Sequence, residues 1–288
     1  MHRRNFMKMV GGLAALPALP SALAASPASI MADFISSGLS EVEACSREAL
    51  AIQSTLKRLK RANIPSTGKF VLVNIPAGNL VAYRDGVPEM EMRAIVGTPD
   101  NKTPETESRI NSVRVNPTWT APDSIARRLK YREKVVSDMN FFLENEFEFR
   151  DHSGSLLTPE QAQAHPNKIA RFVQAAGRYN ILGEYRFNIG SSEAIYLHDT
   201  RDRENFYDGG DITRSAGCVR VEKPVELANW LLPGSEDYIQ EQKRSGSTKD
   251  ISVKDRVAVS LAYYTAWPDA EGVIVIYDDI YNLDMKSC

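Results

Sequence analysis

Hydrophobic and polar residues alternate in two long parts of the chain. Residues 66–122 contain the short runs KFVLVNI, LVAY, MEMRAIV and RINSVRV, with the turn sequences AGN and DG between the first three. Residues 177–288 continue the pattern with YRFNI, AIYLHD, DRVAVSLAYYTAW and GVIVIYDDIY. Short alternating runs separated by turn residues are typical of neighbouring strands in a sheet. The pattern predicts a mostly β, α+β fold in which both parts belong to one sheet-based core.

Helical spacing marks other segments. In residues 25–65 apolar side chains recur at helical intervals, and Ser40 with Glu43 three residues later predicts the start of a helix. Residues 123–176 are charged and show little alternation, which predicts an inserted helical subdomain that caps the cleft as a lid. A short helix is predicted after Pro224, because proline suits the first helical turn. The phenylalanines of the insertion are expected to form a small core of its own: Phe141, Phe142, Phe147 and Phe149.

The first 24 residues have the layout of an export sequence. Arg3 and Arg4 precede an apolar run, and cleavage is expected after Ala24. The paired arginines favour the twin-arginine type of signal peptide, with an ordinary secretory signal as the alternative. No later stretch reaches 18 apolar residues, so no transmembrane segment is predicted in the mature chain. These features predict a periplasmic protein.

Composition and charge narrow the classes of function. The 288 residues include 35 basic and 37 acidic side chains, which argues against a nucleic-acid-binding protein with a basic face. Three cysteines are an odd number, so at least one is unpaired within the chain; Cys45 and Cys288, near the two ends, could bridge. Cys218 with the nearby His198 is two ligands short of a zinc site, and neither a metal nor another cofactor is predicted.

The stretch YLHDTRDRENFYDGGDITRSAGCVRVEKP carries the candidate chemistry. Cys218 follows Gly217, whose backbone freedom suits a turn that directs amide groups inward, and His198 ends the apolar run AIYL at an expected strand end. Acyl transfer needs a thiolate, a base and donors for the oxyanion. We therefore predict Cys218 as nucleophile, His198 as base, and the amides of Gly217 and Cys218 as donors. An imidazolium next to the thiol is expected to lower its pKa. The alternatives are a buried structural cysteine and a histidine with ordinary polar contacts.

The same stretch resembles the L,D-transpeptidases of the YkuD superfamily, in particular the YcbB-like branch. Segments such as VNIPAGNLVAY, NILGEYRFNI and YYTAWPDAEGVIVIYDDIYNLD extend the resemblance over residues 66–284. It implies a YkuD-like β-sandwich catalytic core. Two positions depart from the branch: the proline expected shortly before the NILG segment is absent, and Arg201 stands where proline is common. The motif residues downstream of His198 are Ser215, Gly217, Cys218, Val219 and Arg220.

The resemblance also implies roles for neighbouring residues. The backbone carbonyl of Asp199 is expected to orient the histidine, with the Asp199 carboxylate only a cap or a solvated charge. Arg220 is expected as a carboxylate clamp or loop brace, with a structural salt bridge as the alternative. Ser215 either hydrogen-bonds the histidine or caps the turn. Tyr196 either lines the cleft or belongs to the core.

The reaction that the resemblance implies is peptidoglycan cross-linking. The thiolate would form an acyl-enzyme with a stem peptide, and an amine of a second stem would resolve it to a 3–3 cross-link. Carbapenem β-lactams are the expected inhibitors. The alternatives are an L,D-carboxypeptidase or endopeptidase that uses water, a transpeptidase for 1–3 linkage or protein attachment, and a non-catalytic wall-binding module.

Overall fold

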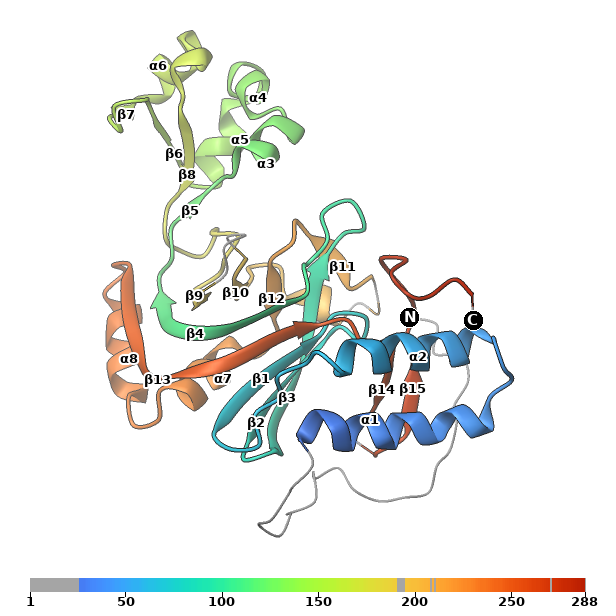
Figure 1. Ribbon diagram of the computed structural model, residues 1–288. Coiled ribbons are helices and arrows are strands. Elements are labelled where there is room, and N and C mark those ends of the chain that lie inside the picture. The colour runs from blue at the N-terminus through green and yellow to red at the C-terminus, as the bar shows by residue number, and fades with distance from the viewer. Residues whose placement is uncertain (1–25, 191–194, 208, 210, 270, 288) are drawn as a thin grey trace.

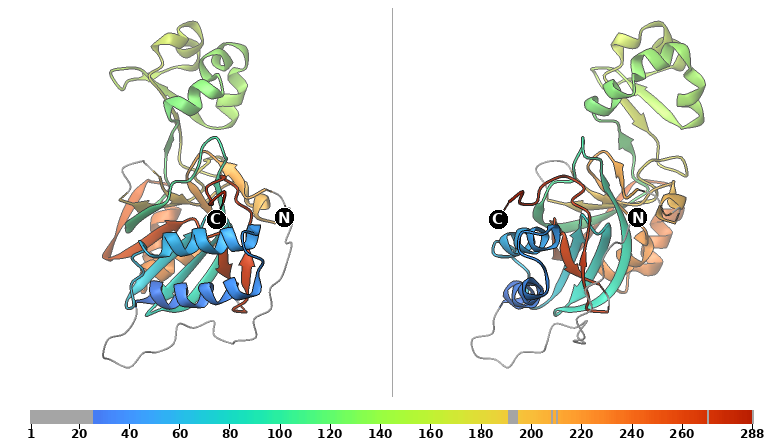
Figure 2. Two further views of the ribbon diagram at one scale, coloured as in Figure 1. Left: turned by 45° about the vertical axis from the view of Figure 1, so that its right-hand side comes forward. Right: turned by 90° about the vertical axis from the view of Figure 1, so that its right-hand side faces the viewer.

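The computed structural model describes residues 26–287, apart from 191–194, 208, 210 and 270. The export sequence predicted for residues 1–24 and the terminal Cys288 lie outside the described residues. The described chain forms a sheet core, a pair of N-terminal helices against it, and an insertion that stands clear of the core in all three views (Figures 1 and 2).

One mixed sheet forms the core. Its strands are β1 (Lys69–Asn74), β2 (Asn79–Arg84), β3 (Val87–Gly97), β4 (Thr106–Val115), β9 (Tyr185–Ile189), β10 (Leu197–His198), β11 (Thr213–Ser215), β12 (Val219–Val221) and β13 (Lys249–Ala262). They lie in the order β11-β3-β12-β10-β9-β4-β13-β1-β2, and β2 also pairs with β3, so the sheet closes on itself. The β1–β13, β10–β12 and β11–β3 pairs are parallel and the others antiparallel. The predicted, mostly β, α+β class is confirmed.

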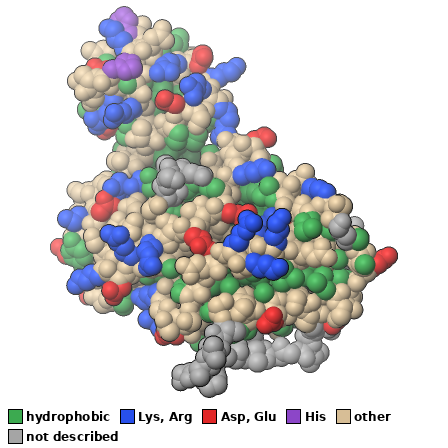
Figure 3. Space-filling view, viewed as in Figure 1, with side chains coloured by type: hydrophobic (Ala, Val, Ile, Leu, Met, Phe, Trp, Pro, Cys, Tyr) green, Lys and Arg blue, Asp and Glu red, His purple; other side chains and the backbone are tan. Residues whose placement is uncertain are grey.

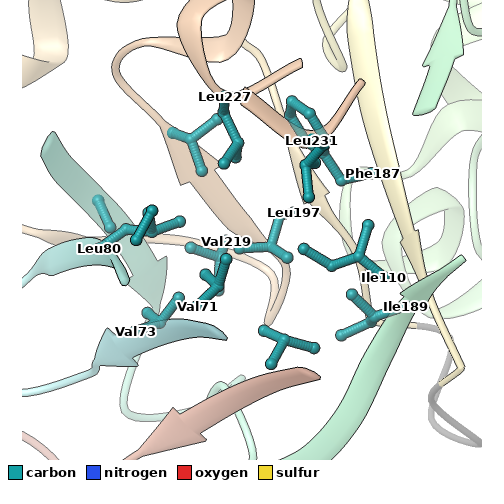
Figure 4. Close-up of a cluster of buried hydrophobic side chains, with 14 of the residues drawn as sticks. Val71, Val73, Leu80, Ile110, Phe187, Ile189, Leu197, Val219, Leu227 and Leu231 are labelled. Atoms are coloured by element: carbon teal, nitrogen blue, oxygen red, sulfur yellow. The ribbon is translucent and has the colours of Figure 1, made fainter. Parts of the chain in front are cut away.

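A single hydrophobic core fills the closed sheet. Val71 and Val73 of β1 lie in it together with Leu197 of β10, because alternate residues of a strand face the same side. The helix predicted after Pro224 is present as α7 (Pro224–Leu231), and α8 (Glu236–Arg244) follows it. Leu227 and Leu231 of α7 point into the same core (Figure 4). The helix therefore shares its core with β10, the strand that carries the candidate histidine.

The N-terminal lead-in contains two helices, α1 (Pro27–Ser37) and α2 (Arg47–Leu59), joined through the 3-10 turn η1 (Gly38–Glu41). The predicted cap at Ser40 is wrong: Ser46 caps α2 by accepting a hydrogen bond from the Ala49 N–H at 3.1 Å. Cys45 has a φ of 64°, and this left-handed residue prevents a continuous helix from Ser40. Both helices pack over the outer side of β1, with β14 (Ala266–Pro268) and β15 (Ile274–Ile276).

The insertion is not purely helical, in contrast to the prediction. Its helices are α3 (Asp123–Arg128), α4 (Tyr131–Ser137), α5 (Met139–Glu144) and α6 (Pro159–Ala164), with the 3-10 turn η2 (Pro166–Lys168). A four-stranded sheet of order β5-β8-β6-β7 accompanies them. Its strands are β5 (Trp119–Thr120), β6 (Phe147–Arg150), β7 (Leu156–Leu157) and β8 (Arg171–Gln174). The sequence FEFR alternates over only four residues, too few to stand out from charged helical text.

The insertion has its own aromatic core, as expected. Phe142, Phe147 and Phe149 are buried together with Tyr131 and Phe172, and Phe141 packs against them. His152 and His165 are exposed, and Figure 3 shows the histidine side chains of that face only at the end of the insertion remote from the sheet. Among the described residues, no helix is both long enough and apolar enough to span a membrane.

Candidate active site

The candidate histidine and cysteine lie on the same face of the sheet. β10 pairs with β12, placing Leu197 beside Val219 and His198 beside Arg220. Leu197 and Val219 point into the core (Figure 4), so His198 and Arg220 face the opposite side. Cys218 precedes Arg220 by two residues, and the Val219 N–H donates to the Tyr196 carbonyl at 3.0 Å. The neighbouring strands thus place the thiol and the imidazole on one surface.

The turn before Cys218 is held by Ser215. Its hydroxyl donates to the Cys218 carbonyl and accepts a hydrogen bond from the Gly217 N–H at 3.1 Å. Of the two roles expected for Ser215, the structure shows the turn cap. Gly217 has a φ of 112°, a region that favours glycine. Its N–H is directed to Ser215, so the predicted role of this amide as an oxyanion donor is not supported, and the Cys218 amide stays the candidate.

The His198 side chain is oriented by its neighbour. Nδ1 hydrogen-bonds to the backbone carbonyl of Asp199, which requires the proton on Nδ1 and leaves Nε2 as an acceptor. His198 is 4% exposed, and burial lowers its pKa to about 3, with a further decrease from the positive charges of Arg220 and Arg186. The imidazole is therefore neutral at neutral pH and has the tautomer of a base.

The Cys218 thiol is also neutral in this environment. Burial raises its pKa above the usual value, and a backbone hydrogen bond from Tyr196 and the charges of Arg186 and Arg220 oppose this only in part. The predicted imidazolium with a lowered thiol pKa is therefore wrong for the resting site. The side chain keeps partial exposure and is not in a disulfide, whereas Cys45 is disulfide-bonded.

Comparisons with known proteins identify the family of this chain. The sequence profile of the L,D-transpeptidase catalytic domain, YkuD, matches residues 68–243. A curated Haemophilus influenzae protein with the provisional name L,D-transpeptidase is 35% identical over 229 residues, which are 77% of this chain and 46% of that protein. The chain belongs to the YkuD family of L,D-transpeptidase catalytic domains. It spans about half the length of this curated relative.

Solved L,D-transpeptidases have much lower similarity. The Mycobacterium smegmatis L,D-transpeptidase is 15% identical, with a TM-score of 0.31 over 66% of this chain and 58% of that one. The E. faecium catalytic domain, solved acylated by ertapenem, is 12% identical, with a TM-score of 0.34 over 70% of this chain and 100% of that one. Membership of the YkuD family therefore rests on the sequence matches.

In this YkuD domain the Asp199 carboxylate is buried, not solvated. It accepts hydrogen bonds from the backbone N–H groups of Glu184 at 2.8 Å and Thr200 at 2.7 Å, and from Arg203 at 2.8 and 3.0 Å. A Cβ on Gly183 would lie 2.4 Å from this carboxylate, which explains the glycine of the NILG segment. The carboxylate fixes the backbone whose carbonyl holds the histidine, so its role is structural.

One arginine beside His198 lies outside the sequence motif. β9 pairs with β10 on the side opposite β12, and places Arg186 beside His198. The Arg186 guanidinium lies 4.4 Å from the Tyr196 ring centroid, and its Nε donates to Asn188 at 2.9 Å. The Tyr196 ring thus stabilises the positive charge of Arg186 on the face of His198.

Within the described residues, neither Arg186 nor Arg220 forms a salt bridge. The structural salt bridge considered for Arg220 is therefore absent there. Alternation in the segment YRFNI predicts that Arg186 and Phe187 point to opposite faces of the sheet. The sequence does not show that Arg186 pairs with His198.

The insertion contacts the loop that follows β10. Arg201, three residues after His198, donates from Nη1 to the Asn145 side chain at 2.6 Å and to the Tyr179 carbonyl at 2.9 Å. The departure from the proline common in the YcbB-like branch thus provides a contact between the histidine loop and the insertion. In the part of the chain that the structure describes, no group of three or more His, Cys, Asp or Glu residues is placed to hold a metal ion.

Proposed function

We propose that this protein is a peptidoglycan L,D-transpeptidase that joins two stem peptides in a 3–3 cross-link. The observation that carries the proposal is the shared face of His198 and Cys218 on paired strands, with Nδ1 held by the Asp199 carbonyl. Membership of the YkuD family supports the reaction class. The identity of donor and acceptor comes from the family resemblance.

The first half-reaction forms an acyl-enzyme. Nε2 of His198 takes the thiol proton while the Cys218 sulfur attacks the carbonyl of the L-centre of diaminopimelate, and the Cys218 amide donates to the oxyanion. The bond to D-Ala then breaks, and His198 returns the proton to the leaving amine. The neutral resting pair suits this step because Nε2 of His198 holds no proton before the attack.

The second half-reaction reverses these roles. An amine of a second stem peptide attacks the thioester, and His198 accepts a proton from that amine. The carbon–sulfur bond breaks, the new amide remains, and the thiol recovers its proton. If water attacks instead, the same residues perform hydrolysis.

Two arginines support recognition of carboxylates. Arg186 and Arg220 flank His198 on its two neighbouring strands, and stem peptides carry free carboxylates near the bond that is attacked. Guanidinium groups bind carboxylates through paired hydrogen bonds. We assign Arg220 the predicted clamp role and add Arg186 to it.

Purified stem peptides test the proposal directly. Incubation with disaccharide-tetrapeptide is expected to release D-Ala and to give a cross-linked dimer, both detected by mass spectrometry. Cys218→Ala is the control, and it should retain the fold and give neither product. Free D-Ala without dimer would identify a carboxypeptidase, and turnover by the Cys218→Ala variant would contradict the mechanism.

We further propose that the protein acts in the periplasm. The disulfide at Cys45 supports an oxidising compartment, where such bonds persist. Fractionation of cells that express the full chain tests this: the protein and the oxidised Cys45 should both appear in the periplasmic fraction. Recovery from the cytoplasm with reduced Cys45 would contradict it.

A further inference from the structure

A buried threonine outside the motif contacts the turn of the nucleophile. Thr103 lies between β3 and β4 and is 2% exposed. Its hydroxyl donates to the Gly217 carbonyl at 2.8 Å and accepts a hydrogen bond from the Gly97 N–H at 2.9 Å. A hydroxyl has a single proton, and the Gly97 contact already uses the oxygen as acceptor, so the proton points to Gly217.

The C-terminal segment in turn holds Thr103. The Thr103 N–H donates to the Tyr281 hydroxyl at 3.1 Å, and this hydroxyl donates to the Gly97 carbonyl at 2.7 Å. Burial raises the pKa of Tyr281, which keeps the phenol protonated as that donor. The Tyr281 N–H donates to the Tyr263 hydroxyl at 2.8 Å, and Tyr263 donates to Asp279 at 2.7 Å. Each hydroxyl proton therefore has one defined acceptor.

This network determines the orientation of the peptide unit that ends at Cys218. Gly217, with a φ of 112° and no side chain, has little local restraint of its own. The C=O and N–H of a trans peptide point in opposite directions, so the contact from Thr103 to the Gly217 carbonyl also sets the direction of the Cys218 N–H. Ser215 restrains the peptide units before and after this one, but not this one.

We propose that Thr103 and Tyr281 are positioning residues for acyl transfer. They act through Gly217 to aim the Cys218 amide at the developing oxyanion, and neither residue touches the substrate. The inference rests on the proposed function, because only a reaction with an oxyanion needs this amide.

Two reactions of the Cys218 sulfur distinguish an effect on the direction of the Cys218 amide from an effect on the reactivity of the thiol. In acylation by a carbapenem, a bond forms from sulfur to the lactam carbonyl, the ring C–N bond breaks and the thiol proton ends on the ring nitrogen, through an oxyanion. In alkylation by iodoacetamide, sulfur displaces iodide, the proton goes to solvent and no oxyanion forms. Both rates are measured by intact-mass spectrometry on the full-length protein, with unfolding temperatures recorded alongside.

Thr103→Val keeps the shape of the side chain and removes its hydroxyl. We expect acylation to slow by about 10- to 100-fold, less than for removal of an oxyanion donor because the amide is misdirected and not lost, and alkylation to stay within about twofold of wild type. Thr103→Ser keeps the hydroxyl and should restore acylation. Tyr281→Phe removes the second hydroxyl and should slow acylation by about 10-fold, which provides a second test if Thr103→Val does not fold.

Three outcomes would overturn the inference. Folded Thr103→Val or Tyr281→Phe protein that acylates at the wild-type rate shows that the contacts do not position the amide. An equal loss of both rates shows a general disturbance of the loop. A wild-type protein that is alkylated but never acylated would overturn the proposed function itself, and this inference with it.

Discussion

At the scale of single residues, burial determines the protonation states of the two candidate catalytic residues. Burial lowers the pKa of His198 and raises that of Cys218, because the charged form of each side chain loses contact with water. Both shifts favour the neutral form. The positive charges of Arg186 and Arg220 favour the thiolate of Cys218, but their effect on its pKa is smaller than that of burial. The site therefore resembles a general-base pair more than a preformed ion pair.

The raised pKa of Cys218 predicts the pH dependence of its reactivity. The thiolate is the species that iodoacetamide alkylates, so the alkylation rate should rise with pH and reach its midpoint above that of a free cysteine, about 8.5. Alkylation rates from pH 6 to 10, with Cys218→Ser as a blank, measure this. A midpoint near neutral pH would show a preformed thiolate and contradict the assignment.

Arg186 provides a prediction on specificity. Arg186→Gln keeps a polar side chain and removes the charge, so KM for a donor with free carboxylates should rise by about 10-fold, since hydrogen bonds to charged groups contribute about 1.5 kcal/mol or more. Arg186→Lys keeps the positive charge, so its KM for this donor should rise less than that of Arg186→Gln. A donor with amidated carboxylates is the control: if Arg186→Gln weakens it equally, Arg186 does not recognise a carboxylate.

At the scale of elements, two buried amides fasten the insertion to the sheet core. Asn180 donates to the Pro117 carbonyl at 2.9 Å and to the Ala175 carbonyl at 2.7 Å, one on each connection of the insertion. Gln174 donates to the Asn145 carbonyl at 3.0 Å and to the Tyr179 carbonyl at 2.6 Å. Hydrogen bonds thus hold both connections of the insertion at the sheet core, and the insertion has a hydrophobic core of its own. The lid role expected from the sequence stays a prediction.

A separate core predicts separate unfolding of the insertion. Phe142 is fully buried among aromatic rings, so Phe142→Ala should destabilise the insertion by about 3–5 kcal/mol. Hydrogen exchange measured by mass spectrometry should then show faster exchange in residues 123–174 and unchanged protection in β1, β4 and β13. Leu143→Ala, at an exposed neighbour, is the matched control and should change neither. Loss of protection throughout the chain would show one cooperative unit.

At the scale of the whole molecule, the closed sheet brings distant segments to the face that carries His198 and Cys218. β1 pairs with β13, about 190 positions later, and the tail residue Tyr281 reaches the loop behind Cys218. Alternation predicted the strands β1–β4, β9, β10 and β13, and proline predicted α7. It did not predict α1, α8 or the strands of the insertion, whose patterns are short or lie within charged text. Strand order and register come from packing between segments far apart in the sequence, which a local pattern does not contain.

The buried His198 links the stability of the whole fold to pH. Its pKa is about 3 in the folded protein and about 6.5 when unfolded, so between these values the unfolded chain binds one more proton. The free energy of unfolding should therefore fall with decreasing pH below about 6.5, by about 1 kcal/mol per pH unit. Urea unfolding at several pH values measures this slope. His198→Gln does not titrate and should show a smaller slope; an equal slope would assign the acid sensitivity to other groups.

The β-rich class, the insertion with its aromatic core, and the candidacy of Cys218 and His198 could all be predicted from the amino-acid sequence, because they depend on local alternation and on a contiguous motif. Three features appear only in the folded chain: Arg186 pairs with His198, the Gly217 N–H donates to Ser215, and Thr103 and Tyr281 hydrogen-bond behind the Cys218 turn. The tertiary structure also makes the resting pair neutral. These properties depend on which strands pair and on how much water each side chain loses, and both are set when remote segments pack together.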